Sequence, residues 1–172
     1  MITSDAAELA PDGLTFAVLS SDHLLRIWSV KDSTVLATIR LKEGFITQFR
    51  YSPGGQRLLT LSDGGLLQLW SLSGTELAKL PQAMPATLFG YSDNGSRIIT
   101  VRGEREVLLW DGEGKLLNRF EPAISGEISG FTFSRNGSRL LLRIGSIRAA
   151  IYDATNGQLV LSLKGVDKGT NY

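Results

Sequence analysis

The sequence predicts an all-β fold built from four small antiparallel sheets, and two periodic markers carry this prediction. A turn that ends in glycine recurs at intervals of 42, 40 and 42 residues, at Gly13, Gly55, Gly95 and Gly137. An aromatic residue recurs 15 residues after each turn glycine, at Trp28, Trp70, Trp110 and Tyr152. Because both markers keep the same intervals, the chain is a fourfold repeat of one supersecondary unit.

Each repeat contains short apolar segments separated by turn residues, which is the pattern of strands joined by hairpins. The segments after the turn glycine are TFAVLS, RLLTLS, RIITVR and RLLLRI. The segments that end at the aromatic residue are LLRIW, LLQLW, VLLW and RAAIY. The last segments are TVLATIRL, ELAKL, KLLNRF and QLVLSL.

A further strand precedes the turn glycine. In three repeats it carries a pair of aromatic residues, namely Phe49 with Tyr51, Phe89 with Tyr91 and Phe131 with Phe133. The first repeat has Ala7 and Leu9 at these positions, which predicts a weaker first strand. Four strands in a period of about 40 to 45 residues are typical of a propeller blade. We expect blades at residues 4–43, 44–83, 84–124 and 125–165, with a tail at 166–172, as one propeller segment.

The string FRYSPGGQRLLTLSDGGLLQLWSLSGTEL, residues 49–77, resembles a WD-repeat blade. The matching features are the aromatic pair, the Ser-Pro-Gly-Gly turn, the Asp-Gly turn and Leu-Gln-Leu-Trp, and the resemblance extends over residues 4–165. It implies a ring of typically seven or eight such sheets around a channel, serving as a rigid platform for other proteins.

The chain departs from the family pattern at the residues that form its hydrogen-bonded network. Its single histidine, His23, lies in a turn, and the Gly-His dipeptide of the family is missing. Asp22 matches the turn aspartate of the family, and Trp110 with Asp111 gives the signature dipeptide once. We therefore expect the blades to depend on apolar packing, with Trp28, Trp70, Trp110 and Tyr152 in the core.

Four blades leave two sheet faces of the array without a neighbour, and soluble monomers seldom expose large apolar faces. A second copy of the chain, related by a twofold axis, would complete an eight-bladed ring. Further blades of a longer chain would cover the same faces. Both alternatives predict association through the open faces.

Composition excludes several functional classes. Lys and Arg total 18 against 17 for Asp and Glu, which argues against a nucleic-acid surface and a polybasic membrane anchor. The chain contains no cysteine, so thiol nucleophiles and thiolate metal sites are absent. One histidine cannot build a typical catalytic zinc site, and the residues adjacent to His23 in its turn are badly placed for a triad. No cofactor, no nucleic acid and no membrane are expected, and the predicted location is cytoplasmic.

Loops on a rigid scaffold are where binding function concentrates. We therefore expect a partner-binding rim at the hairpin turns and blade connections, formed by Asp22, His23, Glu43, Phe45, Asp63, Met84, Arg102, Arg105, Arg143 and Arg148.

The sequence favours a non-enzymatic protein-interaction scaffold. Two alternatives stay open: a regulatory or sensor segment of a larger signalling protein, and a non-catalytic part of a propeller enzyme. The sequence does not identify the partner.

Overall fold

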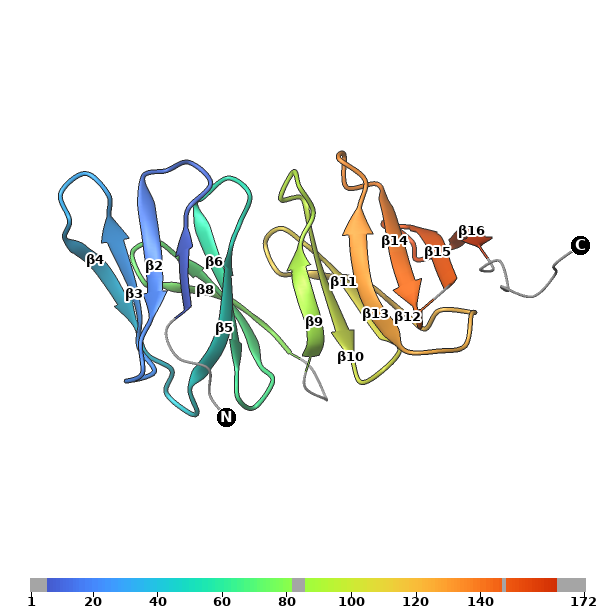
Figure 1. The fold of residues 1–172 in the computed structure, drawn as a ribbon, viewed down its shortest axis with the longest axis horizontal. Helices are drawn as coiled ribbons and strands as arrows, with labels where there is room; N and C mark the ends of the chain where they lie inside the picture. The colour runs from blue at the N-terminus through green and yellow to red at the C-terminus, as the bar shows by residue number, and fades with distance from the viewer. Residues whose placement is uncertain (1–5, 82–85, 147, 164–172) are drawn as a thin grey trace, which may run out of the picture. The chain divides into compact units, whose positions relative to one another are not determined.

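The computed structural model describes residues 6–81, 86–146 and 148–163. Within these ranges the fold is all-β and has no helix (Figure 1). The strands form four separate antiparallel sheets of four strands each. The fold therefore consists of four propeller-like blades, numbered here in chain order.

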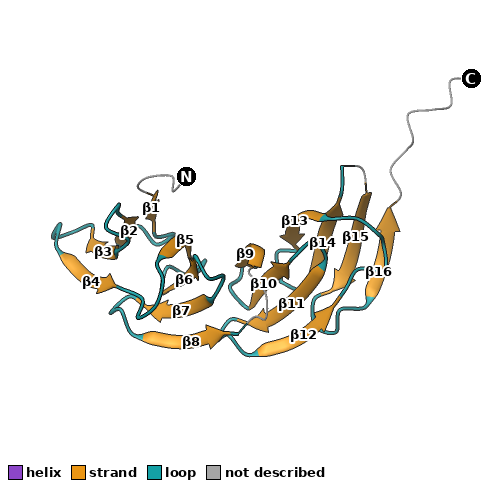
Figure 2. Cartoon of the chain, turned by 90° about the horizontal axis from the view of Figure 1, so that it is seen from below, coloured by secondary structure: helices purple, strands orange, loops and turns teal. Residues whose placement is uncertain are grey.

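Each blade is a meander in which consecutive strands are neighbours (Figure 2). Blade 1 consists of β1 (Ala6–Leu9), β2 (Thr15–Leu19), β3 (Leu25–Ser29) and β4 (Val35–Ile39). Blade 2 consists of β5 (Ile46–Tyr51), β6 (Arg57–Ser62), β7 (Leu67–Ser71) and β8 (Glu76–Leu80). Blade 3 consists of β9 (Ala86–Tyr91), β10 (Arg97–Arg102), β11 (Glu106–Asp111) and β12 (Leu116–Phe120). Blade 4 consists of β13 (Ile128–Phe133), β14 (Arg139–Ile144), β15 (Arg148–Asp153) and β16 (Leu159–Leu163).

The chain divides into two compact units, which are described separately. The first comprises Met1–Ala86 with Gly112–Lys115, and the second comprises Thr87–Asp111 with Leu116–Tyr172. Blades 1 and 2 thus belong to the first unit. Apart from these boundary residues, blades 3 and 4 belong to the second.

The repeated turn glycine closes the first hairpin of every blade. Its N–H donates to the carbonyl oxygen three residues earlier, at 2.9, 2.8, 2.8 and 2.7 Å in blades 1 to 4. In blade 3 the Asn94 side chain also accepts a hydrogen bond from the Ser96 N–H at 3.1 Å, and Asn136 accepts one from Ser138 in blade 4. Turn chemistry of this kind fixes the register of the strands on either side.

The outermost strand of every blade has an irregularity opposite the repeated aromatic residue. In blade 1, Ile27 pairs with Ala37 and Trp28 pairs with Val35, so Leu36 is left out of the ladder. The same shift leaves out one residue in each of the other blades, namely Leu77, Leu117 and Val160. All four residues are exposed aliphatic side chains. One bulge per blade therefore lies at the same place on the outer edge.

The two faces of each sheet differ in composition. The aromatic face carries Trp28, Trp70, Trp110 or Tyr152, and the opposite, aliphatic face carries the intervening residues of the central strands. In the first unit, Ala17 and Ile27 on the aliphatic face of blade 1 belong to one buried cluster with Leu58 and Trp70 of blade 2. Alternation along each strand thus places an apolar stripe on both faces of a sheet.

The second unit repeats this arrangement. Ile99 and Leu109, on the aliphatic face of blade 3, share a buried cluster with Leu140 and Tyr152 on the aromatic face of blade 4. The Tyr152 ring also lies 5.0 Å from the ring of Phe120, between centroids. In both units an aliphatic face therefore packs on the aromatic face of the next blade.

Two of the tryptophans have a hydrogen-bond acceptor inside their own sheet. Trp70 Nε1 donates to Thr60 Oγ1 at 2.9 Å, and Trp110 Nε1 donates to Thr100 Oγ1 at 3.1 Å. Both tryptophans and both threonines are buried. Because a buried indole N–H without an acceptor is costly, these threonines stabilise the packed blades.

We expect Thr60→Val to lower the free energy of unfolding by about 1–3 kcal/mol, because it leaves the buried Trp70 N–H without an acceptor. The measurement is chemical denaturation followed by tryptophan fluorescence. Val18 is the matching residue of blade 1, so Val18→Thr is the control, with an expected change within about 0.5 kcal/mol. Equal losses in the two variants would contradict this explanation.

Gly157 lies where the turn between β15 and β16 meets β12 of the preceding blade. It has a φ of +69°, and a Cβ at this position would lie 2.6 Å from Asn118 Nδ2 and 2.7 Å from Phe120 Cδ1. Gly74 occupies the corresponding turn of blade 2, where a Cβ would lie 3.2 Å from the Ala37 Cβ. Glycine at this turn therefore permits close contact between neighbouring blades.

We expect Gly157→Ala to destabilise the protein more than Gly145→Ala. Gly145 also has a positive φ, +59°, but its Cβ would meet nothing within 4 Å. The control variant should thus cost only the left-handed strain of about 1–2 kcal/mol. Gly157→Ala should cost about 1–3 kcal/mol more because the packed seam must shift. Thermal and chemical unfolding measure the difference, and equal costs would refute the steric role of the turn.

Candidate protein-interaction surfaces

The structure brings three of the sequence-predicted rim residues together in the first unit. The rings of His23 and Phe45 stack with centroids 4.5 Å apart, across the seam between blades 1 and 2. The Phe45 N–H donates to Asp63 Oδ1 at 3.0 Å, and the Asp63 N–H donates to the Phe45 carbonyl oxygen at 2.9 Å. The blade connection and two hairpin turns are therefore fixed to one another by backbone and ring contacts.

Asp22 lies in the same turn as His23 and has a different partner. Arg26 Nη2 donates to Asp22 Oδ2 at 2.5 Å, and Arg26 Nη1 donates to Asp22 Oδ1 at 3.2 Å. The guanidinium of Arg26, together with the Leu24 N–H, holds the pKa of Asp22 below its ordinary value. Because the pair lies on the surface, it contributes little to the stability of the fold.

Glu43 is exposed and borders an open cavity of about 440 Å³ at the outer side of the same blade connection. At this cavity the Gln68 amide donates to Glu76 Oε2 at 2.6 Å. The other residues around it are Arg40, Leu41, Lys42, Leu66, Trp70 and Lys79. Met84 lies outside the described residues, so its place at the rim stays a prediction.

The arginines predicted for the rim of the second unit differ in the solvent exposure of their side chains. Arg102 is only 5% exposed and forms an ion pair with Glu106, which also pairs with Arg119. Arg105 donates to the carbonyl oxygens of Pro122 and Ile124, at 2.7 and 3.2 Å. These two side chains therefore hold the hairpin turn and the blade connection of their own unit.

Arg143 and Arg148 are the exposed members of the set. Arg148 Nη1 donates to the Ser125 carbonyl oxygen at 3.1 Å. Arg143 lies over Gly130, and among the described residues it forms no ion pair. It belongs to the aliphatic face of blade 4, because it lies directly opposite Ala149 in the register.

The proposed core aromatics are not equally buried. Trp70, Trp110 and Tyr152 are 7%, 2% and 2% exposed, whereas Trp28 is only half-buried. Trp28 lies on the face of blade 1 that points away from blade 2. Within the first unit no preceding blade covers that face, which accounts for the difference.

Specific residues of the open sheet faces were not predicted from the sequence. On blade 4 the aliphatic face is a cross-strand row in which Leu141 pairs with Ile151 and Ile151 pairs with Leu161. Leu161 and Leu163 are 48% and 51% exposed. The available signal was the strand alternation of QLVLSL, which has apolar residues on both faces, whereas β8 carries Glu76 and Lys79 and β12 carries Asn118 and Arg119.

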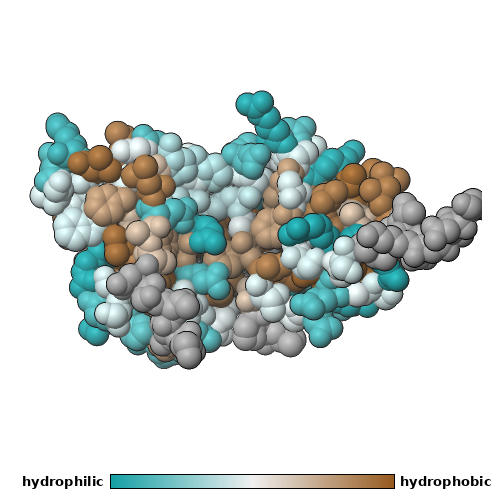
Figure 3. Space-filling model, viewed as in Figure 1, coloured by the Kyte–Doolittle hydropathy of each residue, from teal (hydrophilic) through white to brown (hydrophobic). Residues whose placement is uncertain are grey.

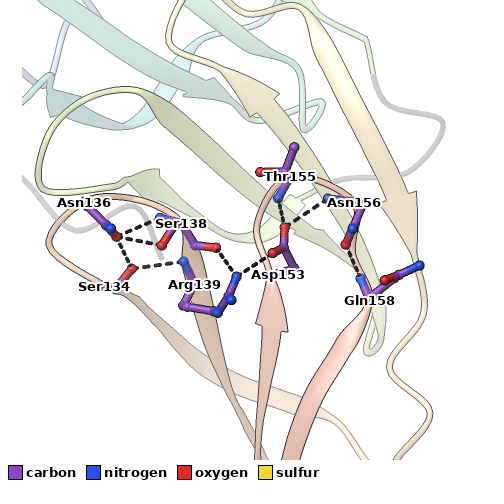
Figure 4. A network of polar contacts seen from close by, with 8 residues as sticks. All are labelled: Ser134, Asn136, Ser138, Arg139, Asp153, Thr155, Asn156 and Gln158. Carbon is purple, nitrogen blue, oxygen red and sulfur yellow. Dashed lines mark hydrogen bonds and ion pairs between the residues drawn. The ribbon is translucent and has the colours of Figure 1, made fainter.

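Polar contacts fix the other end of blade 4. Figure 4 shows Arg139 joining two turns: its guanidinium pairs with Asp153, and its N–H donates to Ser134 Oγ at 2.9 Å. Asp153 Oδ1 accepts the Thr155 N–H at 2.8 Å and the Asn156 N–H at 3.4 Å. The Thr155 N–H, followed by the Asn156 N–H and Arg139, lowers the pKa of Asp153. The aspartate after the repeated aromatic residue thus acts as the cap of the last turn.

A carboxyl group with a lowered pKa stabilises the fold above its ordinary pKa of about 3.9 and loses that contribution as the pH falls through the lowered value. We therefore expect wild-type protein to lose stability below about pH 4, and Asp153→Asn to lose less over the same window. Urea unfolding at several pH values measures this, and a carboxyl ¹³C titration locates the Asp153 pKa. An identical pH dependence of the two proteins would contradict the capping role.

Among the described residues, no group of three or more His, Cys, Asp and Glu side chains is placed to hold a metal ion. None of the described elements is a helix with the length and apolar character needed to cross a bilayer.

Comparison with known proteins finds a similarity over part of the chain. No protein-family model matches the chain. The chain is similar to the cilia- and flagella-associated protein 52 of Sus scrofa, with 29% identity over 63 residues. The match covers 37% of this chain and only 10% of the pig protein. The similarity thus extends over a segment shorter than two blades.

Proposed function

We propose that the chain is a non-enzymatic protein-interaction scaffold built of WD-like propeller blades. The observation that carries the proposal is the pair of open faces, the aromatic face of blade 1 and the aliphatic face of blade 4. They carry the same kinds of side chain that lie buried between blades inside each unit. Exposed contiguous apolar surface of this kind is typical of association sites.

The packing of the sheets explains how such a scaffold would bind a partner. One buried cluster in each unit holds its two blades together. Ring stacking and side-chain hydrogen bonds fix the turns and blade connections of the rim. A partner would therefore meet an ordered surface, and little conformational entropy would be lost on binding. A protein partner fits the near-neutral overall charge of the chain better than a nucleic acid does.

For the aliphatic face of blade 4 we propose an additional blade as the occupant. Inside both units the aliphatic face packs on an aromatic face, so the row of Leu141, Ile151 and Leu161 suits the aromatic face of a further blade. Another repeat or a second copy of this chain could supply it. In blade 1, Ser33 stands where blades 2 and 4 have glycine, so an outer strand that docks there would meet a side chain.

The pig relative guides the search for partners and the expected location. Its name places that protein with cilia and flagella. We propose proteins of these assemblies as the first partners to test, and an intracellular, cytoplasmic location for this chain.

Affinity capture with matched surface variants tests the scaffold function. We expect the wild type to retain proteins that are lost, by at least fivefold, from the rim variant His23→Ala/Phe45→Ala or from the face variant Ile151→Lys. The physical reason is that removing apolar contact area from the centre of an interface weakens it by about 2 kcal/mol or more. Quantitative mass spectrometry measures retention.

The control variant is Asp93→Ala, an exposed turn residue of blade 3 outside both surfaces. Circular dichroism and thermal unfolding establish that each variant folds. Equal retention by all four proteins would refute a scaffold that acts through these surfaces.

A further inference from the structure

Hairpin turns of the second unit contain the three Asn-Gly dipeptides of the chain. Asn94 and Asn136 precede the turn glycines of blades 3 and 4, and Asn156 precedes Gly157 between β15 and β16. All three asparagines are exposed. Figure 3 shows hydrophilic side chains at the upper edge of the view, where the first hairpin turns of these blades lie. Asparagine before glycine deamidates readily, because glycine has no Cβ to restrict the approach of its main-chain nitrogen.

The Asn94 side chain is held at both its oxygen and its nitrogen. Its Oδ1 accepts hydrogen bonds from the Ser92 and Ser96 hydroxyls, each at 2.8 Å, and from the Ser96 N–H at 3.1 Å. Its Nδ2 donates to the Asn136 carbonyl oxygen of the next blade at 2.9 Å. The carboxamide therefore loses several hydrogen bonds if it turns toward the following main-chain nitrogen.

Asn136 repeats the arrangement at its oxygen (Figure 4). Its Oδ1 accepts hydrogen bonds from the Ser134 and Ser138 hydroxyls, each at 2.8 Å, and from the Ser138 N–H at 3.1 Å. Both turns have the sequence Ser-x-Asn-Gly-Ser. A serine two residues before the asparagine and another two residues after it thus hold the amide oxygen from both sides.

Asn156 lacks this pair of serines. Ala154 and Gln158 occupy the corresponding positions, and neither has a hydroxyl group. Its Oδ1 accepts one hydrogen bond, from the Gln158 N–H at 2.9 Å (Figure 4). Within the described residues its Nδ2 has no hydrogen-bond partner. The carboxamide of Asn156 is therefore the least restrained of the three.

The three glycine nitrogens are restrained to the same extent. Each N–H donates to a carbonyl oxygen of its own turn, at 2.8 Å for Gly95, 2.7 Å for Gly137 and 2.8 Å for Gly157. Their φ angles are also alike, at 68°, 70° and 69°. Because the attacking nitrogens do not differ, the hydrogen bonds of the asparagine side chains determine the order of reaction.

We propose that Asn156 is the deamidation site of the folded protein, and that the serine pairs protect Asn94 and Asn136. The Gly157 nitrogen attacks Asn156 Cγ, the Cγ–Nδ2 bond breaks, and ammonia leaves with the proton of the attacking nitrogen. Water then opens the resulting succinimide at either carbonyl carbon, which gives aspartate or isoaspartate. The reaction requires water alone, and the proposal does not depend on the scaffold function.

The product should weaken blade 4 at two contacts. A second carboxylate enters the turn that Asp153 caps, where Asp153 Oδ1 accepts the Asn156 N–H at 3.4 Å, and like charges in one turn repel. Isoaspartate also lengthens the main chain by one carbon directly before Gly157. A Cβ on Gly157 would already lie 2.6 Å from Asn118 Nδ2, so the turn has little room against β12.

Ageing of the full chain tests the proposal. The folded protein is incubated at mildly alkaline pH, and samples are digested with trypsin at mildly acidic pH, which slows further conversion. Trypsin leaves the three dipeptides in separate peptides. Mass spectrometry measures their conversion, and electron-transfer fragmentation identifies isoaspartate. The same chain unfolded in urea gives the reference rate of each dipeptide.

Three variants examine the side-chain hydrogen bonds and the product. Ser138→Ala removes one hydroxyl from Asn136, whereas Gln158→Ser places a hydroxyl two residues after Asn156. Asn156→Ser removes the reacting side chain. Circular dichroism establishes that each variant folds, and thermal unfolding compares fresh with aged protein.

In the folded wild type we expect Asn156 to convert at least fivefold faster than Asn94 and Asn136, and in urea we expect the three rates to agree within about threefold. One hydrogen bond corresponds to roughly a two- to tenfold change in rate. Ser138→Ala should therefore accelerate conversion of Asn136 at least twofold, and Gln158→Ser should slow that of Asn156 at least twofold. The Tm of aged wild type should fall as Asn156 converts, while that of aged Asn156→Ser stays constant.

Equal conversion of the three asparagines in the folded chain would overturn the proposal, and this comparison needs no variant. The same order of rates in urea would overturn it too, because local sequence would then account for the difference. An aged wild type that is as stable as aged Asn156→Ser would refute the weakening of blade 4. The scaffold function is measured separately, by affinity capture.

Discussion

The structure depends on one constraint: each sheet is too thin to bury its own apolar side chains. Four short strands with apolar residues on both faces form no interior, because every side chain points out of the sheet. Burial is therefore obtained where the aliphatic face of one blade packs on the aromatic face of the next, so that Ile27 shares a buried cluster with Trp70 and Leu109 shares one with Tyr152. A face without a neighbour leaves side chains of the same kind exposed, as Leu161 and Leu163 are on blade 4.

The sequence predicted the repeated parts of the fold closely, because they depend on local rules. The segment RLLTLS was expected as a strand and is β6, Arg57–Ser62, and the turn glycines close the hairpins as their spacing indicated. The fixed distance of 15 residues from turn to aromatic reflects a pairing register that is the same in every blade: Phe16 lies opposite Trp28, Leu58 opposite Trp70, Ile98 opposite Trp110 and Leu140 opposite Tyr152. Alternation and turn chemistry act over a few residues, so a single sequence is sufficient to identify them.

The parts that the sequence could not specify depend on contacts between distant segments. Arg105 was expected at a rim, but nothing near it in the sequence indicates that its guanidinium reaches the carbonyl oxygens of Pro122 and Ile124. The stacking of His23 on Phe45 likewise needs the conformation of a blade connection. Trp28 has the spacing of the other aromatic residues, but it is only half-buried because no blade within its unit covers its face.

The bulges in the outer strands have a consequence for how such molecules avoid aggregation. In each blade one aliphatic residue of the outermost strand is left out of the hydrogen-bonded ladder. The unpaired N–H and C=O groups on the free edge of that strand are therefore irregularly spaced at the bulge. A foreign strand that added to this edge would lose its hydrogen bonds at that point, and irregular edges of this kind are a natural protection against sheet-to-sheet polymerisation. The bulges thus disfavour addition of a further strand to the outermost strands, although these strands expose leucine side chains.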